Sequence, residues 1–175
     1  ALSTQRQGEE SKMSSSELIT AAVLVIGDEI LSGRTKDTNS GYIADFLTAC
    51  GIDLKEVRVI SDEMDVIVDA VNTMREQYTY VFTTGGIGPT HDDSTADAVS
   101  SAFGVELKVD DRAVALLKTR ISEDRLNEAR LRMARIPVGA DIILNPVSAA
   151  PGFRIGNVHV MAGVPSVMRA MMDEI

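Results

Sequence analysis

Short apolar runs alternate with amphipathic stretches from residue 19 onward, a pattern typical of a parallel α/β sheet. Residues 21–26 (AAVLVI) are continuously apolar, as in a strand that is buried on both faces. Residues 54–60 and 78–84 are predicted as two further strands. Because a helical stretch follows each strand, the three units predict a parallel sheet with helices on both faces.

The helical stretches have apolar residues at spacings of three and four positions. In the first stretch Ile43, Phe46, Leu47 and Cys50 fall on one face, which predicts that Cys50 packs in the core, and Gly51 is a suitable stop. The second has its apolar face at positions 64, 67, 68 and 71, and the third at positions 98, 99, 102 and 103.

The second half of the chain departs from this rhythm. Residues 105–109 and 141–144 are predicted as short strands. Residues 112–135 are predicted as helical, with a break near Ser122.

A hairpin is predicted near the end of the chain. Two short apolar strands, 152–155 and 158–162, flank Gly156 and Asn157, a two-residue turn signal. His159 alternates with apolar neighbours, so it is predicted to face solvent. We therefore expect a mixed sheet with an antiparallel edge.

The chain divides into a tail and one domain. Residues 1–18 are polar, Ser-rich and without periodicity, which predicts a disordered N-terminal tail, and residues 19–175 form the domain. The Met-rich apolar face between Val164 and Ile175 predicts a last helix packed on the core. The alternatives are that the native protein continues beyond Ile175 or that this face forms an oligomer contact.

Composition and charge exclude several classes of function. The chain has 17 Lys and Arg against 26 Asp and Glu, a formal net charge of −9, which argues against nucleic acid and anionic membrane surfaces as partners. No apolar run approaches the roughly 20 residues of a membrane span. The single cysteine cannot form an internal disulfide, which favours a cytoplasmic location.

Acidic residues follow each of the first three predicted strands. Asp28 follows the first strand, Asp62 the second, and Asp92 and Asp93 the third. Helix capping would explain Asp62 or Asp93 taken singly. However, the carboxyl ends of parallel strands meet at one edge of the sheet, where clustered carboxylates repel one another unless a cation or ligand is bound.

The segment GGIGPT at residues 85–90 is the strongest local signal for ligand binding. Its three glycines permit positive φ angles and close backbone approach, and the helix predicted just beyond favours an anion such as phosphate. The segment is not a Walker A loop, because no Gly-Lys-Ser/Thr follows. His91 stands where a dinucleotide fingerprint has its third glycine. A purely structural turn is the alternative.

Phosphate-seeking amides beside clustered carboxylates predict a divalent metal, Mg²⁺ or another ion, between them. Mg²⁺ takes one or two carboxylates together with phosphate oxygens, an arrangement suited to phosphoryl or nucleotidyl transfer. Arg130 and Arg132 are candidates to reach a ligand phosphate, although a salt-bridged helix surface is the default interpretation of their segment.

Several segments together resemble the molybdopterin-binding domain family with the MoaB/Mog-like fold. The resemblance is carried by GDEILSGRTKDTN at 27–39, SDE at 61–63, TTGGIGPTHDDST at 83–95, NPVSAAPGF at 145–153 and AGVPSVM at 162–168. Within the family, the chain is most similar to amino-terminal domains of the competence-damage-inducible CinA type and to the related domain of FAD synthases.

The resemblance implies a fold and a set of site residues. The fold is a three-layer α/β/α sandwich with a mostly parallel sheet and an antiparallel edge hairpin, in a homo-oligomer for which a trimer is one possibility. Asp62 and Asp93 would serve catalysis and metal binding. The implied ligand- and phosphate-binding positions are Gly27, Asp28, Asn39, Gly85, Gly86, Gly88, Pro89, Thr90 and Thr95.

The resemblance also implies alternative functions toward a small nucleotide or pterin phosphate. CinA-type domains are associated with metal-dependent hydrolysis of a dinucleotide pyrophosphate such as ADP-ribose, and the FAD-synthase relatives with FAD hydrolysis. The alternatives are molybdenum cofactor biosynthesis, by molybdopterin binding or adenylyl transfer, and a non-catalytic ligand-binding module. The chain departs from the CinA pattern at Met133, Ala162 and Val167, where Gln, Pro and Glu are usual.

Overall fold

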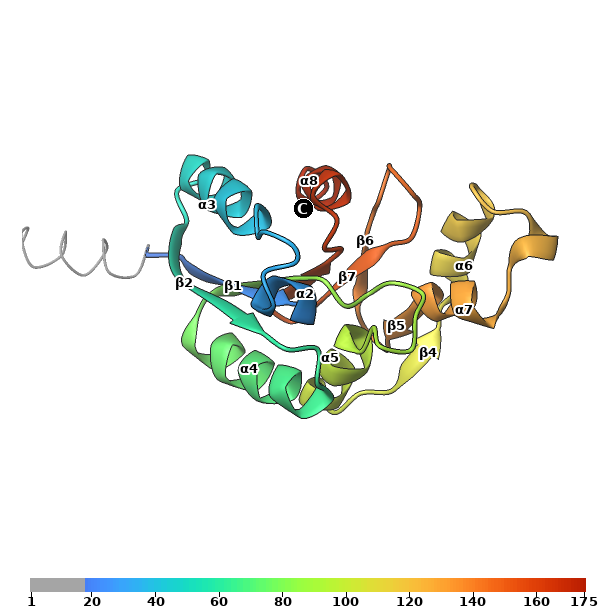
Figure 1. Ribbon diagram of the computed structural model, residues 1–175, viewed down its shortest axis with the longest axis horizontal. Coiled ribbons are helices and arrows are strands. Elements are labelled where there is room, and N and C mark those ends of the chain that lie inside the picture. The colour runs from blue at the N-terminus through green and yellow to red at the C-terminus, as the bar shows by residue number, and fades with distance from the viewer. Residues whose placement is uncertain (1–17) are drawn as a thin grey trace, which may run out of the picture.

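A six-stranded sheet with helices on both faces forms the body of the protein (Figure 1). The computed structural model describes residues 18–175, so the predicted tail lies outside the described residues except for Leu18. The strands are β1 (Thr20–Ile26), β2 (Asp53–Ile60), β3 (Tyr80–Thr84), β4 (Leu107–Val109), β5 (Arg135–Pro137), β6 (Asp141–Ile143), β7 (Gly152–Ile155) and β8 (Val158–Met161). The helices are α2 (Asp28–Leu31), α3 (Asn39–Ala49), α4 (Met64–Gln77), α5 (Thr95–Phe103), α6 (Asp111–Lys118), α7 (Glu128–Leu131) and α8 (Pro165–Met172), with 3-10 turns η1 (Glu123–Arg125) and η2 (Arg132–Ala134).

The sheet is mostly parallel, with an antiparallel edge. Its strand order is β2-β1-β3-β8-β7-β6, and the first four strands in this order run parallel to one another. Strands β7 and β8 form the predicted hairpin, whose turn contains Gly156 at a φ of 56°. The predicted fold class, a mostly parallel sheet between helical layers with an antiparallel edge hairpin, is therefore confirmed.

Two hydrophobic layers explain why β1 is apolar throughout. Residues Ala22 and Leu24 face α4 and α5, whereas Val23 and Val25 face α3 and α8. Helix α8 buries Val167, Met168, Met171 and Met172 in the second layer, so the prediction that its Met-rich face packs on the core is confirmed. No helix within residues 18–175 has the length and hydropathy needed to cross a bilayer.

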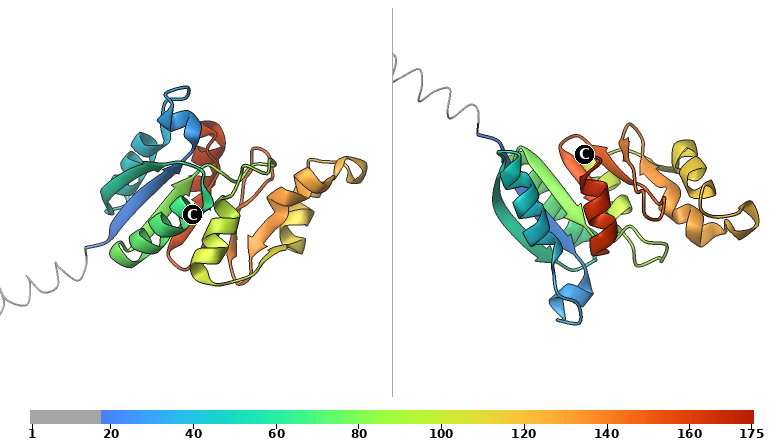
Figure 2. Two further views of the ribbon diagram at one scale, coloured as in Figure 1. Left: turned by 60° about the horizontal axis from the view of Figure 1, so that its bottom comes forward. Right: turned by 90° about the horizontal axis from the view of Figure 1, so that it is seen from above.

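Residues 105–137 form a small lobe beside the sheet (Figure 2). Strands β4 and β5 pair antiparallel with each other and lie outside the main sheet. The predicted helix over 112–135 is interrupted more often than the break near Ser122 suggests. The side chain of Asn127 accepts a hydrogen bond from the Arg130 amide and starts a new short helix, α7.

The structure contradicts two burial predictions. Cys50 is exposed, because it follows the last residue of α3 and lies beyond the helix surface that covers the sheet. His159 is buried, because β8 lies inside the sheet and α8 covers the face toward which its ring points. The imidazole stacks on Phe82, with ring centroids 4.9 Å apart. Burial and, to a smaller extent, the charge of Arg154 lower its pKa from the usual 6.5 to about 4.

The buried imidazole should make stability depend on pH. The unfolded chain binds a proton at His159 near pH 6.5, but the folded chain does so only near pH 4, so stability is present above this window and is lost as the pH falls through it. Between about pH 7 and about pH 5 we expect the unfolding free energy of the wild type to fall by about 2 kcal/mol more than that of His159→Phe.

Urea unfolding at the two pH values measures this difference. His91→Gln is the matched control, because the His91 side chain is 92% exposed, and it should retain the pH dependence of the wild type. Equal pH dependence of the wild type and His159→Phe would contradict the prediction.

Candidate functional site

The carboxyl ends of four parallel strands define the candidate site. Strands β1, β2, β3 and β8 run in the same direction, so the segments that begin at Gly27, Ser61, Gly85 and Ala162 leave the sheet at the same edge. In open α/β sheets this edge is the usual place for a ligand. The predicted acidic and glycine-rich segments therefore come together as expected.

The glycine loop, defined as residues 85–93, begins where there is no space for side chains. Gly85 has a φ of 94°, and a Cβ there would overlap with the carbonyl oxygen of Ile26 at the end of β1. Gly86 has a φ of 74°, and a Cβ there would overlap with Thr95 Oγ1. Both positions thus require glycine for conformation and for space.

Thr95 connects the glycine loop to helix α5. Its side chain is fully buried, and its hydroxyl donates a 3.0 Å hydrogen bond to the carbonyl oxygen of Gly85. Its amide donates to the carbonyl oxygen of Gly86 at 3.1 Å. Two successive carbonyls of the loop therefore accept hydrogen bonds from Thr95, which gives this residue a structural role in shaping the loop.

Three successive amides of the glycine loop remain available to a ligand. Within residues 18–175, no hydrogen bond to protein is donated by the backbone N–H groups of Gly86, Ile87 and Gly88. All three residues line a cavity of about 450 Å³ at the sheet edge. Unpaired amides that follow one another in a loop form a concave site for anions.

Asp93 closes the glycine loop on itself. Its Oδ2 accepts hydrogen bonds from the amide of Thr90 at 3.0 Å and from the hydroxyl of Thr90 at 2.7 Å. Gly88 passes close to the same carboxylate, since a Cβ there would lie 2.8 Å from Oδ2. The carboxylate also lines the cavity, so it shapes the loop and remains within reach of a ligand.

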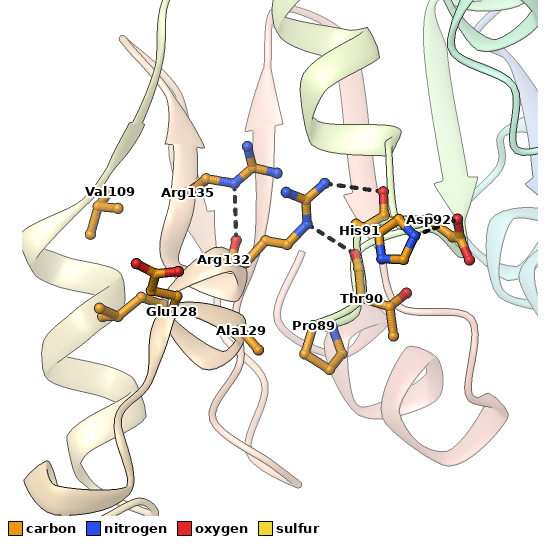
Figure 3. A pocket seen from close by; sticks show the side chains of 10 residues that line it. Pro89, Thr90, His91, Asp92, Val109, Glu128, Ala129, Arg132 and Arg135 are labelled. Carbon is orange, nitrogen blue, oxygen red and sulfur yellow. Dashed lines mark hydrogen bonds and ion pairs between the residues drawn. The ribbon is translucent and has the colours of Figure 1, made fainter.

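Arg132 fixes the outer part of the glycine loop from the small lobe (Figure 3). Its Nε donates to the carbonyl oxygen of Thr90 at 2.9 Å, and its Nη2 donates to that of Asp93 at 3.2 Å. Asp97 lies 3.5 Å from Nη2 and also binds both terminal nitrogens of Arg135. Sequence reasoning considered Arg132 for ligand phosphate, whereas the structure engages it with the protein.

Asp28 and Asp62 form a carboxylate pair at the ends of β1 and β2. The Asp62 amide donates to Asp28 Oδ1 at 3.4 Å. Burial raises the pKa of Asp62, and the nearby charge of Asp28 raises it further. Asp92 of the glycine loop adds a smaller repulsion in the same direction. The charge of the glycine loop thus adds to the repulsion between the two carboxylates, and a bound cation would reduce this repulsion.

The remaining predicted positions have different surroundings. Gly27 precedes α2 and donates its amide to the carbonyl oxygen of Ile60, which joins the ends of β1 and β2. Asn39 is buried, and its Nδ2 donates to the carbonyl oxygen of Gly163 at 2.9 Å rather than facing a ligand. Pro89 and Thr90 are exposed and line an open groove of about 830 Å³ between the glycine loop and the small lobe (Figure 3).

The 145–150 turn also contributes to the cavity, although sequence reasoning gave it no role. The Asn145 side chain accepts from the amides of Val147 and Ser148 and donates to the carbonyl oxygen of Ala150. Ala149 has a φ of 68°, and it is the one residue other than glycine in the described part of the chain with a positive φ. The Asn-Pro sequence was the available turn signal, but it does not indicate which cavity the turn lines.

The donor set fits a magnesium ion only if a phosphate completes its coordination. Among residues 18–175, no group of three or more His, Cys, Asp or Glu side chains is arranged to hold a metal. Asp28 and Asp62 supply two adjacent carboxylates, the number that Mg²⁺ takes alongside phosphate oxygens and water. The metal-binding and catalytic roles of Asp62 and Asp93 stay predictions.

The chain is similar to known protein families over most of its length. A family model described as "Probable molybdopterin binding domain" matches residues 22–175. A curated protein of Thermoplasma acidophilum is 37% identical over 156 residues, covering 87% of this chain and 61% of the relative. A CinA-like protein of Citrifermentans bemidjiense is 39% identical over 160 residues, covering 87% of this chain and 38% of the relative. The chain thus spans only part of the length of these relatives.

Solved structures show the same fold. The crystal structure of CinA from Thermoplasma acidophilum matches with a TM-score of 0.84 and 36% identity, covering 89% of this chain and 95% of that chain. The molybdopterin biosynthesis enzyme MoaB of Thermus thermophilus matches with a TM-score of 0.57 and 16% identity, covering 90% of this chain and 89% of that chain. The second likeness concerns the fold alone.

Removing the Thr95 hydroxyl should loosen the glycine loop. In Thr95→Val the buried carbonyl of Gly85 loses its partner, so we expect a loss of about 1–2 kcal/mol in the unfolding free energy. Thr95→Ser is the matched control, because it retains the hydroxyl and should retain more of the stability. Chemical denaturation measures both variants, and a Val variant as stable as the Ser variant would refute a structural role for the hydroxyl.

Asp62→Asn should leave the fold intact or slightly more stable. The raised pKa of Asp62 means that its ionised form disfavours the folded state, so stability decreases as the pH rises through that pKa. Removal of the charge should add about 0.5 kcal/mol at neutral pH, or about 1–2 °C in Tm. Calorimetry of the variant and the wild type measures the shift. A lower Tm for Asp62→Asn would show that the carboxylate stabilises the fold.

Proposed function

The chain belongs to the molybdopterin-binding domain family, in its CinA-like branch, and on that premise we propose that it is a metal-dependent nucleotide pyrophosphatase. Its substrate is a dinucleotide pyrophosphate of the ADP-ribose or FAD class. The single observation that carries the proposal is the position of three free amides, at residues 86–88, in the same strand-end edge as the Asp28–Asp62 pair. This arrangement combines groups that bind phosphate with groups that bind a cation.

The glycine loop binds the pyrophosphate. The amides of Gly86, Ile87 and Gly88 donate to phosphate oxygens in the cavity, and no side chain at Gly86 or Gly88 obstructs their approach. The loop is held in this conformation by Thr95 on one side and by Arg132 on the other. Because these contacts exist without a ligand, little ordering of the loop is needed on binding.

The carboxylates hold the metal and orient the reacting groups. Asp62 and Asp93 would hold Mg²⁺ or another divalent cation, with Asp28 beside Asp62. The ion would neutralise charge that develops on the phosphate oxygens. Water forms the new bond to phosphorus, the bond to the bridging oxygen breaks, and the products are AMP and ribose 5-phosphate from ADP-ribose, or AMP and FMN from FAD.

Molybdenum cofactor biosynthesis is the second candidate function. The MoaB relative is a molybdopterin biosynthesis enzyme by name, and its fold covers 90% of this chain. The same amides and carboxylates would then bind the phosphate of a pterin, with or without adenylyl transfer. Product analysis distinguishes the two candidates, because only the pyrophosphatase releases AMP from ADP-ribose or FAD in the absence of a pterin.

Incubation with ADP-ribose or FAD and a divalent metal tests the proposal. We expect the wild type to release AMP and Asp62→Asn and Asp93→Asn to release it at least about a hundredfold more slowly. The matched control is Glu76→Gln, which removes an exposed carboxylate near the end of α4 and should retain full activity.

Two other results would contradict parts of the proposal. Measurable binding of either dinucleotide without AMP release by the wild type would favour a pterin enzyme or a binding module. AMP release at equal rates by the wild type and both aspartate variants would confirm the activity but show that Asp62 and Asp93 are not needed for it.

A further inference from the structure

The small lobe carries a hollow whose charged lining consists only of arginine. The hollow has a volume of about 400 Å³ and is lined by Arg120, Ile121, Ser122, Arg125 and Arg130. None of the residues proposed for catalysis lines it. We propose that this hollow is a second anion-binding site, which binds a pyrophosphate group.

Within residues 18–175, none of the three arginines that line the hollow forms an ion pair with a carboxylate. This distinguishes them from Arg58, Arg112, Arg132, Arg135 and Arg154, each of which has an acidic partner. Two further arginines, Arg75 and Arg169, lie over aromatic rings, and Arg34, which also has no ion pair, donates a hydrogen bond to the hydroxyl of Ser32. In a chain with a net charge of −9, three uncompensated guanidinium groups around one hollow are a local exception.

The acidic residues of the same segment do not neutralise the hollow. Glu123 pairs with Lys118 at 3.2 Å, and neither Asp124 nor Glu128 lines the hollow. Like charges brought together repel one another, and a bound anion removes that repulsion. The arrangement is therefore better suited to an anion than to an empty surface.

Backbone contacts hold two of the three guanidinium groups in place. Arg120 Nη2 donates to the carbonyl oxygen of Pro146 at 3.0 Å, and Arg130 Nη1 donates to that of Arg125 at 2.8 Å. A carbonyl accepts a hydrogen bond without neutralising the charge, so each group retains its charge and further donors for a ligand. The Ser122 hydroxyl adds another donor to the lining.

The chemistry of these donors points to phosphate oxygens. Guanidinium forks match the geometry of phosphate and bind it through paired hydrogen bonds. A volume of about 400 Å³ is larger than one phosphate requires and accommodates two linked phosphates. The pyrophosphate group could be free or attached to a nucleoside, so inorganic pyrophosphate and ADP are the two probes that distinguish these sources.

Site-resolved NMR of the whole chain tests the inference without reference to catalysis. We expect inorganic pyrophosphate, added in EDTA, to shift the backbone amides of Ile121 and Ser122 and the guanidinium signals of Arg120, Arg125 and Arg130 in a saturable manner. A stronger response to ADP would identify the nucleoside-attached form as the better ligand, a weaker one would identify the free anion, and an equal one would show that the site binds the pyrophosphate group alone.

Arg125→Gln is the key variant, because no hydrogen bond of the Arg125 side chain within the described residues would be lost on substitution. We expect it to weaken the affinity of this site for pyrophosphate about tenfold, since hydrogen bonds between charged groups are lost. Arg58→Gln is the matched control: it makes the same change in charge on β2, in the main sheet, and should change the affinity less than about twofold.

Shifts confined to residues 85–93 would overturn this inference and leave the phosphate site of the proposed function standing. Shifts confined to the hollow would support this inference and would not contradict the metal-dependent site of the proposed function, because EDTA removes the divalent cation. No saturable shift at the hollow with either probe, or equal affinity in Arg125→Gln and the wild type, would also overturn it.

Discussion

The close approach of backbone segments at the carboxyl edge of the sheet is the constraint on which the site depends. Gly85 lies against the end of β1, and Gly163 follows β8 close to Gly85, with a Cβ at Gly163 placed 3.1 Å from Gly85 Cα. Three neighbouring strands can therefore deliver their loops to one point only because side chains are absent there. The cavity lined by the free amides and by Gly163 depends on this steric condition.

Most of the fold could be predicted because periodicity and burial agree in the body of the protein. The continuous apolar run of β1, the helical stripes of α4 and α5, and the Gly156–Asn157 turn each specify one structure. His159 shows where this reasoning fails: alternation in a short strand does not reveal that both faces are covered. The small lobe was harder still, because local caps such as Asp110 and Asn127 divide it into short helices and turns.

The sequence predicts which loops lie at the candidate site, but not which atoms their side chains contact. Strand ends indicated that Asp28, Asp62 and the glycine loop would meet, since topology alone determines which loops share an edge. The partners of individual side chains depend on geometry that spacing does not encode. Arg132, which lies 39 residues from Asp93, binds its carbonyl oxygen, and Asn39 is directed toward Gly163 in the interior.

The hydrogen bonds from Arg132 of the small lobe to the glycine loop have a thermodynamic consequence. Because Arg132 is anchored beside β5 and donates to the carbonyls of Thr90 and Asp93, release of the lobe would also loosen the outer part of the loop. The two segments should therefore open as one cooperative unit in local unfolding. The coupling is reciprocal: a molecule that binds the glycine loop and limits its motion should also lower the rate of local unfolding in the small lobe. Binding at the loop would then stabilise residues that are distant in sequence, without a change of fold.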